Sequence, residues 1–127
     1  MKSIPKISAA EWEVMKVIWR EAPCTAQTVI DKLSGSQEWG AATIKTLLNR
    51  LVRKKALRFE KEGRAYVYSP AVSEADSRSA EADSFIDRVF GGALSPFLSH
   101  FASSGRRLTA EDLAELEKIV KQTRRKP

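Results

Sequence analysis

Residues 41–70 have the sequence AATIKTLLNRLVRKKALRFEKEGRAYVYSP, and this stretch decides the fold class. Over residues 44–51 the apolar side chains recur at i, i+3, i+4 and i+7, which predicts a helix from just after Gly40 to about Lys55. Apolar and polar residues then alternate on both sides of Glu62-Gly63, which is the pattern of a β-hairpin. A helix followed directly by such a hairpin is typical of a winged helix-turn-helix domain.

The side of this predicted helix that lies opposite the apolar stripe carries no carboxylate. At about 100° per residue, this outward face consists of Ala42, Lys45, Thr46, Asn49, Arg50 and Arg53. A run of charge is often only a solvated helix face, but such faces usually mix acidic residues with basic ones. The small, hydrogen-bonding and cationic side chains found here favour contact with nucleic acid instead.

The basic charge of the chain is concentrated in residues 45–64. This segment holds eight basic and two acidic residues, a balance of +6 that equals the formal net charge of all 127 residues. A local patch of this kind attracts a polyanion. Lys54 belongs to the patch, and Lys61 and Arg64 occupy the tip of the predicted hairpin, where a wing contacts the DNA backbone or the minor groove. We therefore predict that these three residues also contact DNA.

Two further helices are predicted upstream. Ser8 and Glu11 have the spacing of a capping box, which opens a helix that ends near Arg20. A second helix begins at Thr25 and ends near Leu33. With the third helix and the hairpin, these elements predict a winged-helix DNA-binding domain over residues 1–70, within a protein that is mainly α with a small β wing.

Tyr66 and Tyr68 on the predicted hairpin allow two interpretations. Exposed aromatic side chains on strands can stack on the bases of a single-stranded nucleic acid. Aromatic residues on a two-stranded wing more often pack against the first helix of the domain. The sequence favours packing without excluding the first interpretation.

Residues 71–127 differ in character, because nine basic residues are balanced by nine acidic ones. Three short amphipathic helices are predicted, and together they bury little surface alone. The simplest partner is a second copy of the chain, and the alternative is that the helices fold back on the N-terminal unit. The residues predicted to form the dimer interface are Phe85, Ile86, Val89, Leu94, Phe97, Leu98, Phe101, Leu113, Leu116 and Val120. A two-fold dimer would present two recognition helices to a palindromic operator.

The composition excludes several classes of function. With Cys24 as the only cysteine and His100 as the only histidine, no internal disulfide and no cluster for a transition metal is expected. No glycine-rich phosphate loop or catalytic constellation is present, so we expect neither an enzyme nor a cofactor. No apolar run approaches the roughly 20 residues needed to cross a membrane, and no signal peptide is recognisable. We expect a cytoplasmic protein that is not inserted in a membrane.

Three motifs together carry a resemblance to a known family: residues 7–15 (ISAAEWEVM), residues 43–51 (TIKTLLNRL), and Tyr66 with residues 68–70 (YSP). They resemble the penicillinase and methicillin-resistance (BlaI/MecI) repressor family. This resemblance implies a dimeric winged-helix repressor that binds a dyad operator of a β-lactam resistance operon.

The resemblance also implies roles for particular residues. Thr43, Lys45 and Thr46 match operator contacts of the family, with Arg50 and the wing on phosphates. Where this chain has Ala42, the family often has a basic side chain, so the operator sequence stays open.

In members of this family that respond to β-lactams, a membrane-bound sensor with a cytoplasmic metalloprotease domain triggers cleavage of the repressor at an Asn-Phe bond. The matching pair here is His100-Phe101, in which only the phenylalanine agrees. Proteolytic relief is therefore a hypothesis. The copper-responsive branch of the family carries a C-terminal cysteine cluster, which residues 121–127 lack.

The alternative function is a winged-helix adaptor that binds another protein without sequence-specific DNA binding. The acid-free outward face of the third helix favours the repressor.

Overall fold

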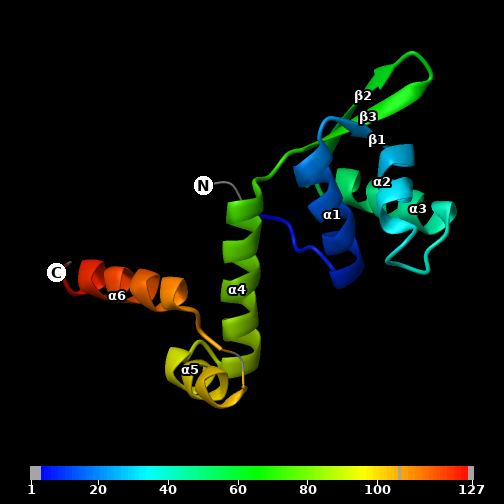
Figure 1. Cartoon of the computed structure of the whole chain (residues 1–127). Helices are drawn as coiled ribbons and strands as arrows, with labels where there is room; N and C mark the ends of the chain where they lie inside the picture. The colour runs from blue at the N-terminus through cyan, green and yellow to red at the C-terminus, as the bar shows by residue number, and fades with distance from the viewer. Residues whose placement is uncertain (1–3, 106, 126–127) are drawn as a thin grey trace. The chain divides into compact units, whose positions relative to one another are not determined.

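The computed structural model describes residues 4–105 and 107–125, and the chain divides into two compact units, Met1–Phe85 and Ile86–Pro127 (Figure 1). The elements in chain order are α1 (Ala9–Glu21), β1 (Cys24–Thr25), α2 (Ala26–Leu33), α3 (Ala41–Arg53), β2 (Leu57–Glu62), β3 (Ala65–Pro70), α4 (Glu74–Phe90), α5 (Leu94–Ser103) and α6 (Ala110–Arg125). The predicted fold class, mainly α with a small β wing, is confirmed. α4 begins in the first unit and ends in the second, and the predicted division of the chain after Pro70 stays a prediction.

The capping box predicted at the start of α1 is present. The backbone N–H of Ser8 donates to Glu11 Oε1 at 2.8 Å, and the N–H of Glu11 donates to Ser8 Oγ at 3.1 Å. Each side chain satisfies an N–H group that the first turn of a helix leaves without a partner. The cap also places the Glu11 carboxylate against the core, where the residue is only 1% exposed.

The apolar faces of α1, α2 and α3 pack together to form the core of the first unit. The apolar stripe predicted for α3 is buried throughout: Ile44, Leu47, Leu48 and Leu51 are at most 5% exposed. Val14, Met15 and Ile18 of α1 are completely buried, and Val29 of α2 is buried with them. Because the stripe of α3 faces inward, its opposite side is turned to solvent.

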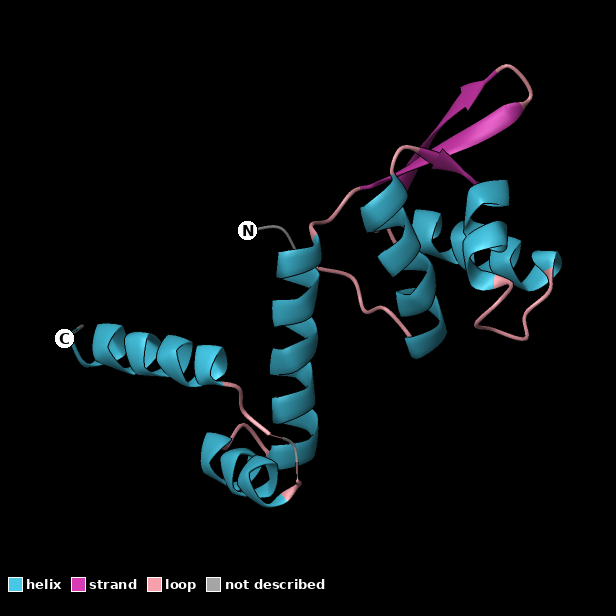
Figure 2. Ribbon diagram, in the orientation of Figure 1, coloured by secondary structure: helices cyan, strands magenta, loops and turns pink. Residues whose placement is uncertain are grey.

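The hairpin is part of a three-stranded antiparallel sheet with the strand order β1-β3-β2 (Figure 2). Its turn contains Gly63 at φ 62°, a conformation in which an L side chain is strained. β1 was not predicted, because two residues are too few to show alternation. Its pairing of Cys24 with Tyr68 joins the loop after α1 to the wing.

The N-terminal part of α4 contributes to the first unit. Ser73 caps the helix by accepting from the N–H of Asp76 at 3.0 Å, and Ser77 is 1% exposed. The indole N–H of Trp19 donates to the carbonyl of Val72 at 3.0 Å, which fixes the segment between β3 and α4 on α1.

The second unit contains the end of α4 together with α5 and α6. Phe90 and Phe97 are in edge-to-face contact, with ring centroids 5.6 Å apart. None of the described residues of this unit is buried. Over the described residues, the helices are all too short or too polar to span a membrane.

Candidate nucleic-acid interface

The outward face of α3 is a solvent-exposed surface without acidic residues. Every residue predicted to contact DNA from this helix is exposed: Ala42, Thr43, Lys45, Thr46, Asn49, Arg50 and Arg53. The hydroxyl of Thr46 donates to the carbonyl of Ala42 at 3.0 Å, which leaves its oxygen available to accept a hydrogen bond from a ligand. Gly40 caps the helix without a side-chain hydrogen bond. The helix therefore presents one continuous face of donors and cations.

The wing tip adds two cations to this surface. Lys61 pairs with Tyr66 across the hairpin, Arg64 lies in the turn, and both are exposed. Residues opposite each other in an antiparallel pair project from the same face, so Lys61 shares a face with Tyr66. Glu60 and Glu62 alternate with Lys61 along β2 and project from the other face.

Lys54 differs from the other basic residues of the patch. Its ammonium group donates to Glu11 Oε1 and, at 3.0 Å, to the carbonyl of Lys6. Over the part of the chain that the structure describes, no other basic residue of 45–64 forms an ion pair. The contact joins the C-terminal end of α3 to the N-terminal end of α1. This geometry supports a role for Lys54 in orienting α3, and its predicted contact with DNA stays a prediction.

The buried Glu11 carboxylate is held ionised by its partners. Burial by itself raises the pKa of Glu11, but the hydrogen bonds from Lys54 and Ser8 outweigh burial and bring the pKa below its ordinary value of 4.5. Glu11 Oε2 has no hydrogen-bond partner among the described residues. The charged form of the buried Glu11 carboxylate is therefore stabilised by Lys54.

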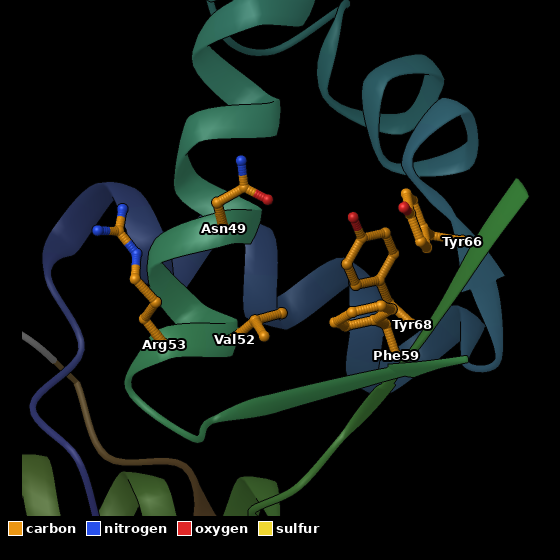
Figure 3. Close-up of a pocket in the computed structure, with 6 residues that line it drawn as sticks. All are labelled: Asn49, Val52, Arg53, Phe59, Tyr66 and Tyr68. Atoms are coloured by element: carbon orange, nitrogen blue, oxygen red, sulfur yellow. The ribbon is translucent and has the colours of Figure 1, made fainter. Parts of the chain in front are cut away.

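Between α3 and the wing lies a cleft that the sequence did not predict (Figure 3). Phe59 and Tyr66, at 46% and 48% exposed, stand on the strand side of this cleft. Tyr68 is 8% exposed and belongs to the core, so the packing interpretation is right for Tyr68. For Tyr66 it is wrong, since nearly half of this side chain is open to solvent. The alternation of the hairpin placed both tyrosines on one face, but it did not indicate which of them would be buried in the core.

The predicted dimerisation residues lie on α4, α5 and α6. Ile86, Phe97 and Phe101 are partly buried, and the others are exposed: Phe85, Val89, Leu94, Leu98, Leu113, Leu116 and Val120. Within the second unit, α5 and α6 line an apolar cavity of about 550 Å³. His100 is exposed, and the His100-Phe101 bond lies inside α5.

The described residues hold no group of three or more His, Cys, Asp or Glu side chains that could bind a metal ion. Burial, followed by the nearby Glu21 charge, raises the pKa of the lone Cys24 thiol, which makes it a poor nucleophile. The exposed cationic surface of the first unit is thus the feature that points to a ligand, and its geometry fits duplex DNA.

The penicillinase repressor family model matches residues 7–122. The chain is 40% identical over 122 residues to a penicillinase repressor of Bacillus licheniformis, in an alignment that covers 96% of this chain and 94% of the relative. It is 30% identical over 115 residues to the methicillin resistance regulatory protein MecI of Mammaliicoccus sciuri, which covers 91% and 93% of the two chains.

The chain also resembles two solved structures of the repressor BlaI. One is the monomeric form of Bacillus licheniformis BlaI in complex with the blaP half-operator, with a TM-score of 0.53. The other is the DNA-binding domain of BlaI, with a TM-score of 0.54. Each is 50% identical to this chain and covers 60% of it and 93% of the solved chain. With the family model spanning nearly its whole length, this chain belongs to the penicillinase repressor family.

Proposed function

We propose that this protein is a dimeric, sequence-specific transcriptional repressor that binds a palindromic operator, and that it controls a β-lactamase or β-lactam-response operon from the cytoplasm. The single observation that carries the proposal is the exposed, acid-free face of α3 within a winged-helix domain. Because the family is one of transcriptional repressors, the prediction that the chain is not an enzyme is confirmed.

The outward residues of α3 fit the edges of base pairs in the major groove. Asn49 offers the paired donor and acceptor that match adenine, and Lys45 suits the acceptors of guanine. The methyl group of Ala42 and the hydroxyl groups of Thr43 and Thr46 can contact thymine and its neighbours. These side chains would supply the sequence specificity of the repressor.

A second group of residues would fix the position of the protein on the duplex through phosphates. Arg50 lies at one edge of the base-reading face of α3, Arg53 lies at the C-terminal end of that face, and Lys61 and Arg64 extend from the wing. Contacts to phosphate set register and orientation without reading sequence. They also make the affinity strongly dependent on salt.

Dimerisation would occur through the apolar surface of α4, α5 and α6. Several large apolar side chains of this surface are exposed to solvent: Leu98 is 54% exposed and Leu116 is 44% exposed. A second copy covers such a surface and places two copies of α3 on one operator. Affinity for the palindrome would rise because binding of the second half-site becomes intramolecular once the first half-site is bound.

Relief of repression would follow from proteolysis by a membrane sensor with a cytoplasmic metalloprotease domain. The bond His100-Phe101 lies within α5, so a protease must first open this helix locally. Cleavage there would separate α6 from the rest of the dimer surface and remove the gain from two linked sites. Incubation with the sensor protease tests this step, and the absence of a fragment ending near His100 would contradict it.

Selection of bound sequences from a random pool of duplex DNA tests the proposed function. We expect a palindrome that outcompetes random duplex by about 10³ or more. Lys45→Ala and Arg53→Ala should each lower operator affinity by about 1–3 kcal/mol, and the loss of a phosphate contact should reduce the salt slope by about 1. Glu13→Ala on α1 is the control and should bind as the wild type does. Equal competition by random duplex, or no binding at low salt, would favour the adaptor.

A further inference from the structure

The cleft between α3 and the wing is formed by two adjoining cavities of about 420 and 460 Å³. Both are lined by Asn49, Tyr66 and Tyr68, so they form one continuous trough along the wing side of the recognition helix. Figure 3 shows the rings of Phe59, Tyr66 and Tyr68 gathered on the strand side, across from Asn49 and Val52 on α3. Base reading by α3 involves the helix side of this trough and leaves its aromatic wall without a role.

The charges of the trough are suited to an anion. Lys45 lines one cavity and Arg53 lines the other, and no carboxylate lines either. The carboxylates of Glu60 and Glu62 project from the opposite face of the hairpin, because strand residues alternate in direction. The polar groups at its walls include the Asn49 and Gln27 amides. An occupant with negative charge and hydrogen-bonding oxygen atoms is therefore favoured.

The trough also has a flat apolar wall. Tyr66 is 48% exposed and is held edge-to-face against Phe59, with ring centroids 5.1 Å apart. Phe59 in turn lies 6.3 Å from the ring of the buried Tyr68, which anchors the group to the core. The Tyr66 ring is therefore held by its aromatic neighbours, while nearly half of the residue is open to solvent. An aromatic face beside cations is complementary to a ligand that alternates apolar rings with phosphates.

We propose that the trough holds the sugar–phosphate backbone of one operator strand between the major groove read by α3 and the wing contact. A deoxyribose lies against the Tyr66 ring, and a flanking phosphate lies against Arg53. This inference rests on the proposed function, since it names the part of the DNA that this cleft binds. Tyr66 then fixes the distance between the recognition helix and the wing on the duplex.

Substitution of Tyr66 in the full chain tests the proposal with the operator recovered by selection. Tyr66→Ala should weaken operator binding about tenfold, on the scale of a lost aromatic contact to DNA. The slope of log Kd against log salt should not change, because no charge is removed. Tyr66→Phe keeps the ring and should bind within about twofold of the wild type. An equal loss in both variants would overturn the ring contact.

Failure of this inference is distinguishable from failure of the proposed function. If Tyr66→Ala binds as the wild type does while Lys45→Ala is weakened, the strand does not use the trough, and the repressor function stands. If the wild type does not prefer the operator over random duplex, the proposed function itself is wrong.

Hydroxyl-radical cleavage of saturated complexes provides a second measurement, which does not depend on affinity. The wild type should protect a deoxyribose between the major-groove and wing contacts, and Tyr66→Ala should expose that position while the flanking protection stays. Unchanged protection in the variant would overturn the proposal. Tryptophan fluorescence verifies that the variant is folded, because Trp12, Trp19 and Trp39 all lie in the first unit.

Discussion

The two units of this chain differ in how they use their apolar side chains. In Met1–Phe85 the side chains of Leu48 and Leu51 are completely buried, and the helices enclose a core. Among the described residues of Ile86–Pro127 none is buried, although α5 and α6 also carry large apolar side chains. Burial of apolar surface is the main favourable contribution to folding. The comparison teaches that the first unit encloses a core of its own, whereas the described part of the second unit does not, and this difference is the basis of the proposed dimer surface.

Disruption of the surface of the second unit is expected to have the largest effect. Leu116→Asp places a charge where a second copy would pack, and it should convert the dimer to a monomer by analytical ultracentrifugation. Affinity for the palindromic operator should fall by about 10² or more, while affinity for a half-site stays unchanged. Glu117→Gln is a neighbouring control that should remain dimeric. A variant Leu116→Asp that stays dimeric would break the comparison between the two units.

Truncation of a leucine should affect the free energy of unfolding differently in the two units. Leu48→Ala should lower the free energy of unfolding of the first unit by about 3 kcal/mol, because the buried site leaves a cavity. Leu98→Ala in α5 is the matched substitution at a site that is 54% exposed, and it should change that free energy by less than about 0.5 kcal/mol. Urea unfolding followed by tryptophan fluorescence measures both, since all three tryptophans lie in the first unit. Similar losses in the two variants would mean that the units unfold as one.

Removal of the Lys54 cation should have a smaller effect that is still confined to the first unit. Lys54→Met leaves the buried Glu11 carboxylate without its cation. The free energy of unfolding should fall by about 1–2 kcal/mol, which is less than for a fully buried ion pair because the Lys54 side chain is 37% exposed. The salt slope of operator binding should not change. Lys55→Met, at the next exposed lysine, is the control for stability. A slope reduced by about 1 in Lys54→Met would instead assign Lys54 to a phosphate.

The same ion pair predicts a pH dependence. The pKa of Glu11 is lower in the folded protein than its ordinary value of 4.5, so the pair contributes fully above that pH. The contribution is lost as the pH falls through the lowered pKa. Glu11→Gln should therefore show a shallower loss of stability in acid than the wild type, measured by urea unfolding between about pH 3 and 6. Parallel curves for the two proteins would contradict the assignment.

The smallest expected effect concerns the backbone after α3. Lys55 has φ 68°, a left-handed conformation that costs a residue with a side chain more than it costs glycine. Lys55→Gly should raise the free energy of unfolding of the first unit by about 0.5–1 kcal/mol, after allowance for the greater freedom of glycine in the unfolded chain. Thermal unfolding measures the change. A loss of stability would show that the Lys55 side chain stabilises the fold by more than the left-handed backbone conformation destabilises it.

The local elements of this fold could be predicted because their signals lie within a few residues of each other. Ser8 and Glu11 gave the start of α1, and the residues around Gly63 gave the hairpin. β1 escaped prediction because Cys24 and Thr25 form a strand only by pairing with β3, more than 40 residues away. For the same reason the exposure of Tyr66 and the burial of Tyr68 could not be separated from sequence.

By itself, the sequence determined the helices, the wing and the acid-free face of α3, because periodicity, capping and charge are properties of neighbouring residues. Only the tertiary structure decided that Lys54 meets Glu11, 43 residues away, and that Tyr66 stands over an open trough. Those outcomes depend on how α1, α3 and the wing pack against one another. Packing of distant segments is set by the shape of the whole core, and no local pattern encodes it.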